Sequence, residues 1–248
     1  MVVLKTTKEL QLMSEACKLS AQALKIGGAA VEPGITTREI DHIIKKFITS
    51  QGATPSFLNY GGFPASACIS INDVVIHGIP SARKIVEGDI VSIDVGAYYN
   101  GYHGDNAATF AAGKVSAEAE KLMEATENSL YLAIKAAQPG ARIGDIGNTV
   151  QTYIESMGFA VVRKFVGHGV GAKLHEDPEV PNYGTAGHGI RLLPGMTIAI
   201  EPMVNISGED VKVLGDGWTT VTKSGSLAAH FEHTIAITEN GPVIMTKA

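Results

Sequence analysis

The sequence predicts an α+β fold in which a pair of helices followed by antiparallel strands occurs twice within one domain. Three observations support this class. Apolar residues repeat at helical spacing over 8–52 and again over 116–158, and each stretch is followed by short, β-branched runs. The segments 31–52 and 137–158 resemble each other. No linker or low-complexity run divides the 248 residues.

The first helix pair is predicted from spacing and capping signals. Apolar residues at steps of three and four predict a helix over 8–25. Thr36 follows a Pro-Gly turn and has Glu39 three residues later, which is a capping box ahead of an apolar face. We therefore expect a second helix that begins after Thr36 and ends near Gly52.

The second helix pair repeats this pattern 106 residues later. Residues 116–137 are good helix formers, and 137–158 aligns with 31–52 at six identical positions in 22. Chance or shared helix-start chemistry is one explanation, but the Pro-Gly turn before each segment's helix and the glycine after it are among the matches, which favours a duplicated unit. We expect a single domain, 1–248, with related halves at approximately 1–110 and 111–248. The identical pairs are Pro33/Pro139, Gly34/Gly140, Ile40/Ile146, Ile48/Ile154, Ser50/Ser156 and Gly52/Gly158.

Strands are predicted where short β-branched runs are bounded by Gly, Pro or Asn. Because they follow helix pairs rather than alternate with single helices, mostly antiparallel pairing is expected. The predicted strands cover 68–76, 89–95, 160–166, 196–204 and 231–237.

Composition excludes several functional classes. No apolar run reaches the roughly 18 residues that cross a bilayer, and the start of the chain has no signal-peptide core. The formal charge of −5, without a basic stripe, argues against nucleic acid as the principal ligand. Two cysteines, Cys17 and Cys68, are too few for a disulfide framework. We expect a cytoplasmic protein with no membrane and no specific nucleic-acid partner.

A hairpin brings two carboxylates together. Asn100-Gly101 lies between two strand-like runs and predicts a two-residue turn, so paired residue numbers add up to 201. Gly96 then faces Asp105, and Asp94 lies on the same face, about 7–8 Å away diagonally. Two anions this close repel unless a proton or cation lies between them.

Three further polar residues interrupt apolar strands. They are His168 between glycines, Glu201 in TIAIEPMV and Glu232 in HFEHTIAIT. Each alone is better explained as a satisfied polar residue at a strand end. Together with the paired aspartates they favour a metal site. Four carboxylates and one imidazole suit two divalent ions of the Mn, Fe(II) or Co type better than a closed structural zinc.

These residues and their contexts resemble the type I methionine aminopeptidases. The matching motifs are SIDVGAYYNGYHGD, GHGVG, AIEPM and FEHT, with SINDVVIHGIP and DGWTTVT elsewhere, and the resemblance covers essentially the whole chain. It implies the pita-bread fold, with two pseudo-symmetric α+β halves around a central antiparallel sheet. It also implies removal of the N-terminal methionine from nascent proteins and peptides whose second residue is small.

The resemblance further implies a ligand set and a mechanism. Asp94 would bind the first metal, His168 and Glu201 the second, and Asp105 and Glu232 would bridge them. The cofactors would be two divalent ions: Co, Mn or Fe(II), with Zn or Ni as alternatives. Hydroxide generated there would attack the scissile carbonyl, with Glu201 as general base and then acid. His175 would stabilise the oxyanion or hold the carbonyl, and His77 would contact the scissile amide.

The methionine pocket is implied by the same resemblance. Tyr60, Cys68, His77 and Trp218 would surround the thioether, although Cys68 could equally be a core residue. The chain departs from the common bacterial pattern at Phe57, Phe63, Leu174 and His230, which keep the pocket apolar and leave its exact shape and inhibitor preferences open. His233 is expected to be structural, and solvated side chains are expected at His42, His103 and His188.

Two alternatives share the fold. Proline-specific aminopeptidases carry a large additional N-terminal domain, whereas the first helix here is expected within ten residues of Met1. A catalytically inactive binding module would be expected to have lost ligands, and all five are present. The favoured partners are therefore methionyl peptides and nascent chains, at the ribosome, with the enzyme as a monomer.

Overall fold

The computed structural model describes residues 1–247, which form four α-helices, one short 3-10 helix and fifteen strands. The helices are α1 (Thr7–Ala29), α2 (Thr37–Ser50), α3 (Ala117–Ala136), α4 (Ile143–Ser156) and η1 (Tyr60–Gly62). The strands are β1 (Thr54–Pro55), β2 (Ala67–Ile71), β3 (Val74–Ile76), β4 (Ile90–Tyr99), β5 (Tyr102–Ala111), β6 (Ala160–Val161), β7 (Gly167–Gly169), β8 (Glu176–Val180), β9 (Thr197–Ile200), β10 (Met203–Asn205), β11 (Val211–Val213), β12 (Thr220–Thr222), β13 (Ala228–His230), β14 (Glu232–Thr238) and β15 (Gly241–Ile244).

A nine-stranded antiparallel sheet forms the centre of the molecule. Its order is β1-β4-β5-β14-β9-β7-β8, with β2 also on β4 and β15 also on β14. Two three-stranded sheets, β13-β10-β6 and β11-β12-β3, lie beside it. Every strand pair in the described residues is antiparallel, which confirms the predicted pairing.

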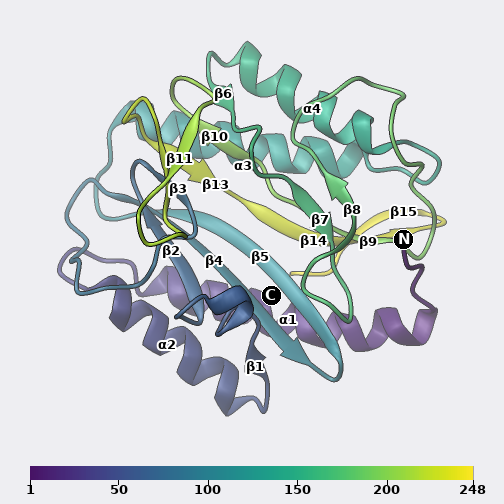
Figure 1. The fold of residues 1–248 in the computed structure, drawn as a ribbon, viewed down its shortest axis with the longest axis horizontal. Helices are drawn as coiled ribbons and strands as arrows, with labels where there is room; N and C mark the ends of the chain where they lie inside the picture. The colour runs from purple at the N-terminus through teal and green to yellow at the C-terminus, as the bar shows by residue number, and fades with distance from the viewer. Residues whose placement is uncertain (248) are drawn as a thin grey trace.

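The two helix pairs lie over different ends of the sheet system (Figure 1). α1 packs on β4 and β5, and α2 packs on α1 and β2. α3 and α4 pack on each other, with α3 against β13 and α4 against β6. Each pair covers its own apolar cluster, one including Ile44 and Ile93 and the other Leu122 and Ile146. None of the helices in residues 1–247 is long and apolar enough to cross a membrane.

The helix starts agree with the capping signals. The hydroxyl of Thr36 accepts the N–H of Glu39, and the Glu39 carboxylate accepts the Thr36 N–H at 2.8 Å, which confirms the predicted capping box. α2 and α4 have the same length of 14 residues and begin 106 residues apart, at Thr37 and Ile143. At α4 the Asp145 carboxylate accepts the backbone N–H of Arg142 at 2.7 Å.

The hairpin register is confirmed along the whole of β4 and β5. Tyr99 pairs with Tyr102 and Gly96 pairs with Asp105. Asn100 and Gly101 both have positive φ, 50° and 89°, as a type I′ turn requires. The turn therefore fixes which face of the sheet carries the two aspartates.

Three predicted strands were wrong in extent. The run 68–76 is two strands, because Asn72 takes φ 58° and its side chain donates to Asp89 and accepts from the Ile90 N–H. The run 196–204 breaks at Glu201-Pro202, where proline has no N–H to continue the ladder. Of 160–166, only Ala160–Val161 pairs as a strand.

Gly104 allows α1 to lie directly on β5. A Cβ at this position would overlap the backbone of Cys17 in α1. We expect Gly104→Ala to lower the free energy of unfolding by about 2 kcal/mol, because helix and strand must separate. Urea titration would measure this loss. Gly215→Ala is the matched control, since nothing lies within 4 Å of the added methyl. Equal stability of the two variants would contradict this packing.

Candidate metal centre and adjoining cavity

Five neighbouring strands of the central sheet each bring one polar side chain to a common point. In the order β4-β5-β14-β9-β7, the first three strands carry Asp94, Asp105 and Glu232, Glu201 directly follows β9, and β7 carries His168. The sheet order, rather than the chain order, therefore assembles the group.

The register places the carboxylates on one face. Ala107 of β5 pairs with Asp94 on one side and with Glu232 on the other, so these three residues form one row across the sheet. Asp105 is two residues from Ala107 and shares its face. The break after Ile200 brings Glu201 to the end of the same row, next to Glu232, because Ile200 pairs with His233.

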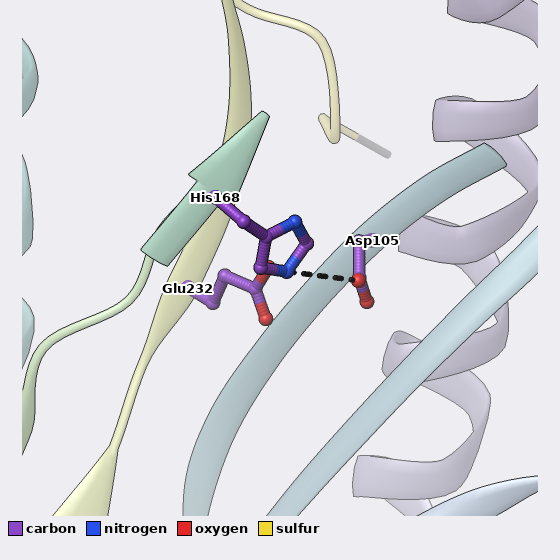
Figure 2. A group of neighbouring side chains, drawn as sticks. All are labelled: Asp105, His168 and Glu232. Atoms are coloured by element: carbon purple, nitrogen blue, oxygen red, sulfur yellow. Dashed lines mark ion pairs between the residues drawn. The ribbon is translucent and has the colours of Figure 1, made fainter. Parts of the chain in front are cut away.

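His168 presents one ring nitrogen to the carboxylates (Figure 2). Its Nδ1 lies 2.9 Å from the carbonyl oxygen of Gly169, which can only accept, so Nδ1 carries the proton. Burial lowers the pKa of His168 to about 3, and the ring is therefore neutral at pH 7. Nε2 is left with a free lone pair, 3.5 Å from Glu201 Oε1 and 3.8 Å from Asp105 Oδ2. This tautomer is the one that binds a metal through Nε2.

The four carboxylates have no cationic partner among the described residues around them, and they repel one another. Burial raises the pKa of Asp94 to about 7. Burial, and then the neighbouring carboxylates, hold the pKa values of Asp105, Glu201 and Glu232 well above their usual range. The buried oxygens Asp94 Oδ1, Asp105 Oδ1 and Glu232 Oε1 have no hydrogen-bond partner. Unpartnered, buried acceptors are unfavourable, and divalent cations would satisfy them.

A cavity of about 150 Å³ opens above this group. Phe57, Phe63, Cys68 and Leu174 form a buried apolar cluster on its wall, against which Trp218 packs. The sequence and the family resemblance together predict thirteen residues in the site, and all of them line this cavity. They are Phe57, Tyr60, Phe63, Cys68, His77, Asp94, Asp105, His168, Leu174, His175, Glu201, Trp218 and Glu232.

His77 is held in an unusual backbone conformation. Its φ is +58°, in the left-handed region that residues other than glycine seldom adopt. The ring packs edge-on against Trp218 and Phe165, with centroids 6.0 and 5.6 Å away. Burial, and secondarily His175, lower the pKa of His77 to about 4, so it is a neutral hydrogen-bonding group at pH 7.

His175 lies at the mouth of the cavity. Its Nδ1 is 2.8 Å from the Tyr60 hydroxyl, and its ring centroid is 4.1 Å from that of His168. The side chain is exposed, so these two contacts and the backbone of its loop set its direction.

Sequence reasoning missed some of the surroundings. His230, which departs from the family pattern, is buried, and its Nε2 lies 3.7 Å from Glu201 Oε2. His103 is partly buried rather than solvated, because its ring centroid lies 4.6 Å from that of Tyr98 and Ser56 Oγ lies 2.8 Å from its Nδ1. No local signal identifies either contact, since both depend on distant segments. His42 and His188 are exposed, and His233 contacts Thr246 through its Nδ1.

Comparison with known proteins places the chain in a family. Residues 11–239 match the model of metallopeptidase family M24. Methionine aminopeptidase of Clostridium perfringens is 53% identical, over 99% of both chains. Methionine aminopeptidase 1 of Bacillus subtilis is 51% identical, over 100% of both.

Solved structures agree. Methionine aminopeptidase from Rickettsia prowazekii superposes with a TM-score of 0.98 at 40% identity, covering 100% of both chains. Prolidase from Pyrococcus furiosus has a TM-score of 0.80 at 25% identity, and the match covers 99% of this chain but 66% of that one. The shared architecture is the pita-bread fold. On its family match and its full-length relatives, the chain belongs to metallopeptidase family M24.

Proposed function

We propose that this protein is a methionine aminopeptidase, which hydrolyses the peptide bond after an N-terminal methionine when the second residue is small. One observation carries the proposal: four carboxylates and a neutral imidazole share a cavity of about 150 Å³ with an apolar wall. These five polar side chains form one side of the cavity, called the polar floor below, and are suited to hydrolysis. The apolar wall beside them is suited to a thioether side chain.

The polar floor is proposed to hold two divalent ions. Asp94, Asp105, His168, Glu201 and Glu232 would be the ligands, and the two central carboxylates, Asp105 and Glu232, would bridge. The oxygen-rich donor set favours Co, Mn or Fe(II), with Zn or Ni as alternatives. When bound, the ions would supply Lewis-acid activation of water and of the scissile carbonyl.

The side chains around the floor have separate proposed roles. Glu201 accepts the proton of the attacking water and returns it to the leaving amine, because its carboxylate lies at the edge of the group and reaches the cavity. His175, directed by Tyr60, donates a hydrogen bond to the developing oxyanion. Neutral His77 contacts the scissile amide. Phe57, Phe63, Cys68, Leu174 and Trp218 surround the methionine side chain.

The chain is proposed to act as a monomeric, cytoplasmic enzyme on nascent chains at the ribosome. It is also proposed to be one catalytic domain built from two related halves, which the equal lengths and spacing of α2 and α4 support.

Peptide hydrolysis tests the substrate class. After chelation and re-addition of Mn or Co, we expect cleavage of Met-Ala-Ser, at least about 100-fold slower cleavage of Met-Lys-Ser, and none of Ala-Pro-Ala. Chelated protein is expected to be inactive. Cleavage of Ala-Pro-Ala alone would instead indicate a proline-specific enzyme. Inactivity of metal-loaded protein on all three peptides would favour a binding module. Metal analysis of protein purified without chelator would identify the ion.

A further inference from the structure

A buried ion pair links the N-terminal segment to the loop that carries His175. Lys5 Nζ lies 2.6 Å from Glu176 Oε2, and the two side chains are only 4% and 11% exposed. The residues are 171 positions apart in the sequence. A buried ion pair is weak evidence for stability, because desolvation of both charges offsets their attraction, but it fixes two segments in one arrangement.

The lysine end of the pair is anchored independently of Glu176. The backbone N–H of Lys5 donates to the carbonyl of Gly195 at 2.8 Å, and Nζ also donates to the carbonyl of Val3 at 3.3 Å. Gly195 has no side chain, and a Cβ there would come within 2.9 Å of the Lys5 carbonyl oxygen. The ammonium group therefore occupies a defined position.

The glutamate end closes the loop 171–176. While Oε2 accepts from Lys5, Oε1 accepts the backbone N–H of Lys173 at 3.1 Å. Gly171 lies against the pair, since a Cβ there would meet both Glu176 Oε2 and Lys5 Cε at 2.7 Å. The carbonyl of Gly171 accepts the N–H of His103 in β5 at 2.9 Å. One end of the loop is thus attached to the strand that carries Asp105, and the other end to Lys5.

His175 directly precedes Glu176 in this loop. Its ring is exposed on one side and contacts only the His168 ring and Tyr60 among the aromatic groups described, so its distance from the cavity also depends on the loop backbone. A displacement of about 1 Å at a reacting group can change a rate by up to about 100-fold. The backbone on the C-terminal side of His175 has two restraints, the pairing of Glu176 with Gly169 in β7 and the ion pair with Lys5, and loss of the ion pair would remove the second.

We propose that Lys5 and Glu176 are positioning residues for the reaction and act through His175. This inference rests on the proposed function, in which His175 contacts the substrate carbonyl. Neither residue lines the 150 Å³ cavity or belongs to the metal-binding group.

Two substitutions test the proposal in the full-length, metal-loaded protein. Lys5→Met and Glu176→Gln are each expected to lower kcat on Met-Ala-Ser by about 10-fold, with KM changed less than about twofold. Lys8→Met and Glu239→Gln, at exposed positions, are the matched controls and are expected to leave kcat unchanged. If Lys5→Met does not fold, Glu176→Gln carries the test, because the amide keeps the size of the carboxylate.

A double-mutant cycle separates positioning from a general structural role. In a His175→Ala background, where residual turnover is measured, Glu176→Gln is expected to change kcat by less than about twofold. A further 10-fold loss in that background would show that the pair does not act through His175, and would overturn the proposal. So would unchanged kcat in both single variants.

A spectroscopic measurement does not depend on turnover. In metal-free protein labelled at histidine Cε1, the His175 ring signal is expected to shift or broaden in Glu176→Gln, while the signal of exposed His42 stays in place. An unchanged His175 signal would contradict the proposal. Wild-type protein that cleaves no methionyl peptide would refute the proposed function instead, and this spectrum would still report whether the pair orders His175.

Discussion

Glu201→Gln is expected to reduce kcat on Met-Ala-Ser by at least about 100-fold without unfolding the protein. The glutamine amide keeps the size of the carboxylate but cannot accept a proton. The backbone carbonyl of Glu201 remains bonded to the Asn182 side chain at 2.9 Å, and Pro202 still ends the strand, so the local chain path should persist. Steady-state kinetics would measure the loss, and thermal unfolding would check the fold.

His168→Ala is expected to give an equally large loss for a different reason. It removes the only imidazole whose Nε2 faces both Glu201 and Asp105 among the described residues, and metal content should fall with activity. Glu239→Gln, at an exposed turn, is the control for both variants. Near-normal turnover of Glu201→Gln would contradict the role of Glu201 as general base, and near-normal turnover of His168→Ala would contradict the role of His168 as a metal ligand.

The hairpin shows why part of the site could be predicted from the sequence. Asn100-Gly101 specifies a two-residue turn, and side-chain alternation then places Asp94 and Asp105 on one face without further information. The capping box of α2 is local in the same way. Features set by a few adjacent residues are thus readable before the fold is known.

Other features depend on segments that meet only in the folded chain. No local pattern in the sequence determines the strand order β4-β5-β14-β9-β7. The sequence alone therefore indicates only that five polar residues interrupt apolar strands and favour a metal site. The family resemblance is what implies that these five form the full ligand set. The sequence predicts Glu201 within a continuous strand over 196–204, whereas Pro202 interrupts the ladder and the Glu201 carboxylate reaches the cavity. The contact between His230 and Glu201 and the Lys5–Glu176 pair had no sequence signal.

The metal-free protein is expected to lose stability as pH rises above about 6.5. The pKa of Asp94 is raised by burial from 3.8 to about 7, so the folded state holds a proton that the unfolded state has released. Stability is then present at low pH and is lost as pH rises through the folded pKa. Asp105, Glu201 and Glu232, whose pKa values are also raised, act in the same direction and extend the loss to higher pH.

Buried histidines act in the opposite direction, but at lower pH. Burial lowers the pKa values of His77, His103 and His233 to about 4 and those of His168 and His230 to about 3, so their contribution to stability increases as pH rises through the unfolded pKa of 6.5 and levels off about one pH unit above it. Above pH 6.5 each histidine adds at most about 0.4 kcal/mol more, which is less than each carboxylate held protonated in the folded state loses, so the carboxylates determine the trend. One unmatched proton changes the free energy of unfolding by about 1.4 kcal/mol per pH unit.

Urea titrations of chelated protein at pH 6.5 and 8 are expected to show a loss of about 1 to 3 kcal/mol in the free energy of unfolding. Mn-loaded protein is expected to show no such loss, because cations stabilise the ionised carboxylates and bind more tightly as protons leave. Glu232→Gln removes one of the repelling carboxylates, and in chelated protein it should reduce the loss. The opposite result is a free energy of unfolding of chelated wild-type protein that stays constant or rises between pH 6.5 and 8. It would show that these carboxylates are not held protonated without metal. The electrostatic reason for placing cations among them would then be removed.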